Sequence, residues 1–268
     1  MSLLLCGKRA KVPFYYEKLN IRLYSLEEAA YCIRRYPLIT VDGLVNESFA
    51  DWVRTQGLSQ TLAEELAKGL EQGESTENLL LKVVQTANFM PLAEIRALSS
   101  LLAGFRNMIP WERLRLTGKM YFDSGRLKSA YEKFGEALTE LTKENAGRSD
   151  ELETEIGKAD RADLICDMVA VSMLRFDKKE AVRLLDSIGS AGRYRRAEEY
   201  RYLITGDAIL SEEEKNALKD RKRRLEMSVR QSRKIKKLKE LSTADYAEFS
   251  KAAAQTLTEW KRDYRRTT

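Results

Sequence analysis

Histidine is absent from all 268 residues of this sequence. Histidine is the commonest general base in enzymes, the usual partner of serine and cysteine nucleophiles, and a frequent transition-metal ligand. The glycine–lysine pairs, Gly7-Lys8 and Gly118-Lys119, stand alone without the spacing of a phosphate-binding loop. The paired carboxylates fall where helix surfaces and helix caps are expected. We therefore expect a protein that is not an enzyme and that uses no cofactor and no metal.

Cysteine is scarce, and long hydrophobic runs are missing. The three cysteines, Cys6, Cys32 and Cys166, are far apart and in no C-x-x-C pair, so neither a disulfide framework nor a zinc ribbon is indicated. No stretch reaches the roughly 18 apolar residues that a membrane helix needs. The opening MSLLLCGKRAK has an apolar run of four residues, too short for the core of a signal peptide. We expect a soluble protein of the reducing cytoplasm, without membrane insertion.

Proline and glycine are also few, with 4 and 14 residues, while 43% of the chain is hydrophobic and 33% is charged. This balance favours a folded, helix-rich chain. Helix starts are well marked between residues 25 and 145: a capping box at Ser25–Glu28, polar caps at Asn46, Ser59 and Ser75 or Thr76, and prolines at 91 and 110 that suit first helical positions. The sequence predicts successive short helices there.

Strand signals are confined to the first two dozen residues. In NIRLYS, Ile21 and Leu23 alternate with polar neighbours, and SLLLC is a second candidate, although each is short enough to be loop or helix. Farther along, Ser149, a turn at Asp177 and a capping box at Ser211–Glu214 predict more helices, and Ser242 restarts a final one. The predicted fold class is all-α, with a short strand pair near the N-terminus as a possible addition.

Residues 111–141 alternate large and small side chains at helical spacing. The pattern consists of Leu114, Gly118, Tyr121, Gly125, Leu127, Ala130, Phe134 and Ala137. It resembles the tetratricopeptide repeat, a helical hairpin of about 34 residues, with Thr117 in place of the usual leucine. The physical basis is packing, because Gly118 and Ala130 let two helix backbones approach each other.

A looser copy occupies residues 162–188, where Ala181 and Leu185 match Ala130 and Phe134, and Phe176 stands where the turn glycine belongs. Since one such hairpin cannot bury its faces alone, the resemblance implies a stack of at least three helical pairs. An irregular helical bundle that contains one hairpin is the alternative. The opening residues are also similar to the start of an uncharacterised bacterial family, which implies nothing about activity.

In peptide-binding members of the repeat family, the first helix of each hairpin lines a concave groove. Carried over by register, the resemblance places Arg115, Lys119, Phe122 and Asp123 on the groove side. Arg115 and Lys119 are one helical turn apart and share a face, so together they could hold a partner's carboxylate. Family members that bind chaperone tails also need asparagines at set positions. Lys119 stands at one of those positions here, so the resemblance does not extend to chaperone-tail binding. An ordinary solvated charged face is the alternative.

Basic residues are concentrated near the C-terminus. Between residues 221 and 239 there is one acidic residue and there are ten basic residues. The basic residues are Arg221, Lys222, Arg223, Arg224, Arg230, Arg233, Lys234, Lys236, Lys237 and Lys239. The whole chain carries +6 and residues 211–268 carry +7, so residues 1–210 sum to about −1. Such a helix could follow a phosphate backbone, but this stretch has no aromatic residue for base stacking. A solvated or intramolecularly docked face and an acidic protein or membrane surface are the alternatives.

These observations divide the chain into three expected regions. They are an N-terminal helical region at 1–106, tetratricopeptide-like hairpins at 107–210, and a basic C-terminal segment at 211–268. The expected function is non-catalytic binding of another protein or peptide through the groove of the hairpins. The alternative is a nucleic-acid-associated protein that uses the basic helix at 221–239.

Overall fold

The computed structural model describes residues 7–146, 151–189, 193–206 and 208–224, residues 251–256, and the single residues 248 and 258. The chain forms two compact units, Met1–Ile204 and Thr205–Thr268. The boundary lies close to the expected start of the C-terminal segment. The expected regions 1–106 and 107–210 share the first unit, apart from residues 205–210, which belong to the second.

The first unit begins with a short antiparallel sheet, β1 (Phe14–Tyr16) and β2 (Ile21–Leu23). The strand expected around Ile21 and Leu23 is confirmed. Its partner is β1 rather than SLLLC, since residues 2–6 lie outside the described residues. The inner face of the sheet is apolar, and the buried Tyr16 hydroxyl donates a hydrogen bond to the carbonyl of Ile39 over 2.7 Å.

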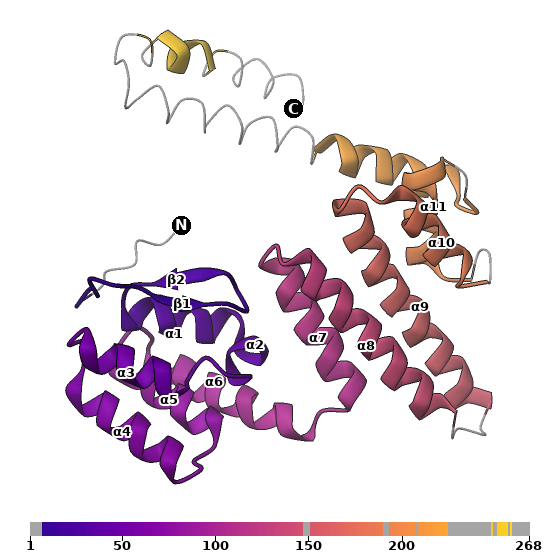
Figure 1. Ribbon diagram of the computed structural model, residues 1–268. Coiled ribbons are helices and arrows are strands. Elements are labelled where there is room, and N and C mark those ends of the chain that lie inside the picture. Colours follow the sequence, from indigo (N-terminus) through magenta and orange to yellow (C-terminus); the bar gives the residue numbers. More distant parts are fainter. Residues whose placement is uncertain are drawn as a thin grey trace. The chain divides into compact units, whose positions relative to one another are not determined.

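Helices follow the sheet and bury its inner face (Figure 1). They are α1 (Leu26–Arg35), α2 (Pro37–Val41), α3 (Glu47–Thr55), α4 (Gln60–Glu71), α5 (Thr76–Ala87) and α6 (Leu92–Gly104), and the last leads into a 3-10 turn, η1 (Phe105–Asn107). The ring of Phe14 packs edge-on against Phe49, with the centroids 5.1 Å apart, and Trp52 adjoins both rings. The sheet and α3 therefore share one aromatic core.

The predicted helix starts are largely confirmed. The side chains of Ser25, Asn46, Ser59 and Ser75 each accept a hydrogen bond from the third helical N–H that follows. At the Ser25 cap, the carboxylate of Glu28 reaches back to the N–H of Tyr24 over 2.6 Å, one residue before the position that the capping box predicts. Pro110 is the first residue of its helix, whereas Pro91 lies just before α6.

The second half of the first unit contains longer helices. They are α7 (Pro110–Asp123), α8 (Leu127–Asn145), α9 (Glu151–Leu174), α10 (Lys178–Asp186) and α11 (Arg195–Thr205), the last of which ends one residue into the second unit. α8 packs between α7 and α9, and α9 also packs on α10 (Figure 1). α2 packs on α7 and thereby joins this part to the N-terminal helices. The expected cap Ser149 lies outside the described residues.

In the second unit, residues 212–224 are helical, and the capping box at their start is present in full. The N–H of Glu214 donates to the Ser211 hydroxyl over 3.2 Å, and the Glu214 carboxylate accepts from the N–H of Ser211 over 2.9 Å. Residues 251–256 are also helical, while the expected helix start at Ser242 lies outside the described residues. The described part of the protein is thus mostly helical, with one short sheet.

Candidate functional site

The turn between α7 and α8 and the turn between α9 and α10 have the same hydrogen bonds at positions 51 residues apart. In the first turn, the N–H of Arg126 donates to the carbonyl of Tyr121 over 2.8 Å; in the second, Asp177 donates to Ser172 over 2.9 Å. The residue before each donor has a left-handed backbone, with φ of +76° at Gly125 and +61° at Phe176. Both helices therefore end in a Schellman motif.

The packing inside the two hairpins also corresponds. Ala130 on α8 and Ala181 on α10 are both completely buried, and they stand at equivalent positions. Phe134 and Leu185, four residues later in each helix, are 2% and 1% exposed. The predicted correspondence between residues 111–141 and 162–188 thus extends to helix ends, turns and buried positions.

Arg115 on α7 points toward α9 and is enclosed there, with a side chain only 15% exposed. Its Nε donates to Asp167 Oδ2 over 2.8 Å, and its Nη2 donates to Asp163 Oδ2 over 3.3 Å. From α11, Arg196 Nη2 donates to Asp167 Oδ1 over 2.6 Å. These four residues, here called the aspartate cluster, link α7, α9 and α11.

The charges of the aspartate cluster balance, with two guanidinium groups and two carboxylates. Burial alone would lower the pKa of Arg115, but the hydrogen bonds and charges of Asp167 and Asp163 outweigh it and raise that pKa. The pKa of Arg196 is likewise raised, because Asp167 outweighs the effect of burial. The two guanidinium groups therefore stay charged at all ordinary pH values. The aspartate cluster thus acts as a structural connection between α7, α9 and α11.

The four residues expected on the groove side are in different environments. Arg115 is engaged by the aspartate cluster, whereas Lys119, one turn later on α7, is exposed. Phe122 is half-buried, and Asp123 is exposed and lies 3.9 Å from Arg35 of α1. A partner's carboxylate at this face would therefore meet Lys119 rather than the predicted pair of cations.

Of the ten basic residues expected to hold a polyanion, Arg221, Lys222, Arg223 and Arg224 are described. All four are helical and exposed. The other six, Arg230, Arg233, Lys234, Lys236, Lys237 and Lys239, lie outside the described residues.

Cys32 and Cys166 lie in the hydrophobic core of the protein. Both are buried free thiols, 5% and 1% exposed. Burial raises the pKa of each thiol to about 12, so neither is an activated nucleophile at neutral pH. Within the described residues, no group of three or more acidic or cysteine side chains is arranged to hold a metal ion, and no helix there is long and apolar enough to cross a membrane.

Sequence reasoning missed the carboxylate half of the aspartate cluster. Asp163 and Asp167 are four residues apart, on one face of a helix whose other nearby residues are mostly apolar. Buried carboxylates need cationic partners, so this spacing on an apolar helix was a usable signal. The sequence singled out Arg115 only as a groove residue and did not single out Arg196, so it did not indicate that either would pair with these carboxylates.

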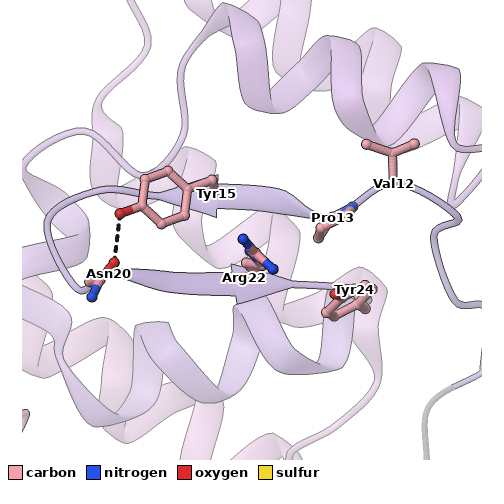
Figure 2. A pocket seen from close by; sticks show the side chains of 6 residues that line it. All are labelled: Val12, Pro13, Tyr15, Asn20, Arg22 and Tyr24. Carbon is pink, nitrogen blue, oxygen red and sulfur yellow. Dashed lines mark hydrogen bonds between the residues drawn. The ribbon is translucent and has the colours of Figure 1, made fainter.

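A second feature that the sequence did not mark lies on the outer face of the β1–β2 sheet. An open cavity of about 890 Å³ lies there. Figure 2 shows the side chains around it, several of them aromatic or polar. Its lining consists of Val12, Pro13, Tyr15, Asn20, Arg22 and Tyr24. The side chains arise mainly from the two strands and from the residues that flank them.

No model of a protein family matches this chain, and no curated protein or solved structure matches it either.

Proposed function

We propose that this protein is a non-catalytic binding module that holds a partner protein on a stack of tetratricopeptide-like hairpins. The observation that carries the proposal is the recurrence of one hairpin design 51 residues apart, with matching Schellman turns and matching buried alanines at 130 and 181. Hairpins that repeat in this way form rigid, extended binding surfaces in solenoid proteins.

The binding surface of this proposal is the side on which α7, α9 and α11 are linked. The aspartate cluster joins these three helices by charge-assisted hydrogen bonds, which fix their spacing before a partner arrives. A surface that is ordered in advance loses little conformational entropy on binding. Lys119 supplies an exposed cation there and Phe122 a half-buried ring, so the partner offers a carboxylate beside an apolar side chain.

The test compares charge reversals at two exposed lysines. Lys119→Glu on α7 is compared with Lys128→Glu on α8, where Lys128 is also exposed and pairs only loosely, at 3.9 Å, with Glu132. Affinity capture from a lysate of the source organism should recover the same protein with the original chain and with Lys128→Glu, and fail to recover it with Lys119→Glu. Equal capture by both variants would show that the partner does not bind at the proposed surface.

Arg115→Glu is unsuitable for this experiment. It would place a third carboxylate beside Asp163 and Asp167, and weaker binding would then reflect a damaged fold. Lys119→Glu leaves the aspartate cluster intact. The thermal midpoint of this variant should therefore remain within about 2 °C of that of the unchanged protein, as for a surface substitution.

A second candidate is nucleic-acid association through the basic stretch at 221–239. It is favoured by the exposure of Arg221, Lys222, Arg223 and Arg224 on one helical segment. Replacing these four with glutamine should reduce the slope of log affinity against log salt by about 0.9 for each phosphate of duplex DNA that is no longer neutralised. An unchanged slope would exclude this role for the four residues.

A further inference from the structure

The outer face of the β1–β2 sheet presents an aromatic ring in a fixed position. Tyr15 is 50% exposed, and its hydroxyl donates a hydrogen bond to Asn20 Oδ1 over 2.6 Å, as the dashed line in Figure 2 marks. Asn20 itself has a left-handed backbone, with φ of +54°, in the turn between the strands. This hydrogen bond connects the Tyr15 ring to the turn between the strands, so the orientation of the ring is set without a ligand.

A guanidinium group lies beside this ring, and a second one lies over the ring of Tyr24. Arg22 is paired with Tyr15 in the sheet register and is exposed on the same face. At the end of β2, the guanidinium of Arg9 lies 4.8 Å from the centroid of the Tyr24 ring. Two aromatic rings, Tyr15 and Tyr24, and one guanidinium group, that of Arg22, therefore line the open cavity (Figure 2).

The local charge is strongly positive. Residues 7–24 contain five basic residues and one acidic residue, Glu17, whereas residues 1–210 as a whole sum to about −1. Lys18 is paired with Asp42. Among the described residues, Arg22 has no carboxylate within ion-pair distance, so its guanidinium remains available to an anionic ligand.

We propose that this face, here called the Tyr15 face, binds single-stranded nucleic acid. An exposed ring can stack on a base, and the neighbouring guanidinium of Arg22 can contact a phosphate. Tyr24 follows directly after β2 and also lines the cavity, so it offers a second ring on this face. A duplex keeps its base faces stacked inside, so the Tyr15 face prefers single strands.

The Tyr15 face shares no residue with the hairpin surface or with the basic stretch at 221–239. The stretch between Arg221 and Lys239 has many cations but no aromatic residue, so it can recognise charge alone. The Tyr15 face combines a cation with aromatic rings. Removal of the Tyr15 ring should therefore weaken binding, an effect that a surface with charges alone would not show.

The experiment measures binding of the full chain to a fluorescein-labelled oligothymidylate of about ten nucleotides, a length within the usual site size of single-strand binders. Tyr15→Ala should weaken binding about tenfold or more, because the stacked ring is removed. Tyr15→Phe keeps the ring and should retain most of the affinity. Tyr31→Ala is the matched control, since Tyr31 is 47% exposed on α1 and outside the cavity lining.

The charge contribution is tested with Arg22→Gln. Removal of one cation from the phosphates should reduce the salt slope by about 0.7 for a single strand, with Lys128→Gln on α8 as the control. Ultraviolet crosslinking to a bromodeoxyuridine oligonucleotide should also label the peptide that contains Tyr15. Crosslinking reads the location directly and does not require that the alanine variant fold.

Three results would overturn the proposal: no measurable binding of the oligonucleotide, equal affinity of Tyr15→Ala and Tyr31→Ala, or crosslinks only in the C-terminal segment. Equal affinity for heparin and for the oligonucleotide, weakened by Arg22→Gln but not by Tyr15→Ala, would assign the face to polyanions in general. Binding to anionic lipid vesicles that depends on Tyr15, with none to the oligonucleotide, would assign it to a membrane surface instead. Either outcome contradicts the proposal.

Discussion

Gly118 of α7 lies directly against the ring of Phe134 on α8. A β-carbon added at Gly118 would stand 2.6 Å from Cε1 of that ring and 2.7 Å from Cδ1. Real β-carbons do not approach other heavy atoms so closely, and Phe134 is 2% exposed, with little room to withdraw. The close approach sets the separation of the two helices in the first hairpin.

Gly118→Ala should therefore destabilise the protein by about 1–3 kcal/mol, because overpacking outweighs the gain in helix propensity. Gly135→Ala on α8 is the control, since an added β-carbon there has no atom within 4 Å. The control should gain up to about 1 kcal/mol from propensity alone. Urea unfolding of both variants measures the difference, and a Gly118→Ala protein as stable as its control would contradict the close approach.

Phe176 ends α9 in a conformation that suits glycine. Its φ is +61° and its side chain is 95% exposed, so the ring gains little burial in return for the backbone strain. Phe176→Gly should stabilise the protein by about 1 kcal/mol, whereas Phe176→Ala keeps the β-carbon and should give no such gain. Thermal unfolding of the two variants distinguishes them. A less stable Phe176→Gly protein would show that the ring makes a stabilising contact.

Local signals in the sequence predicted much of the fold. The caps at Ser25, Asn46 and Ser59 and the turn at Gly125 depend on interactions within a few residues, so the residue types alone indicate them. The correspondence of Ala130 with Ala181 was also predictable, because it follows from packing rules within one hairpin. The predicted fold class was accordingly correct at the level of a mostly helical protein with a short strand pair.

Interactions between distant residues were not predictable in this way. Arg115 was expected to face a groove, but which helix it faces depends on the packing of α9, and its partners are 48 and 52 residues away in sequence. The strand β1 was missed because its residues, Phe14 to Tyr16, are all aromatic and show no alternation of polar and apolar types. Pairing with β2 and packing of Phe14 against Phe49 and Trp52 give these three residues their strand conformation.

Asp167 is the residue on which the link between α7, α9 and α11 depends. Its side chain is 6% exposed and accepts hydrogen bonds from both Arg115 and Arg196. Asp167→Ala should cost about 3 kcal/mol, since two partly buried guanidinium groups would share Asp163 alone. Asp186→Ala, which removes a pair between Arg201 and a 60% exposed carboxylate, should cost less than about 1 kcal/mol. Equal destabilisation in denaturant unfolding would show that the cluster stabilises no more than a surface pair.

The buried thiols make the stability of the protein dependent on alkaline pH. Burial raises the pKa of Cys32 and of Cys166 from 9.0 to about 12, so the native state retains protons that the unfolded chain releases. The resulting stabilisation is fully present below about pH 9 and is lost as the pH rises toward 12, because the unfolded state then binds fewer protons than the native state. Denaturant unfolding at increasing pH should therefore give a falling free energy of unfolding. In the double variant Cys32→Ala/Cys166→Ala, the free energy of unfolding should fall less steeply over the same pH range. The altered packing also changes the stability of this variant at neutral pH. Parallel pH profiles for the two proteins would mean that these thiols are not shielded from ionisation in the native state.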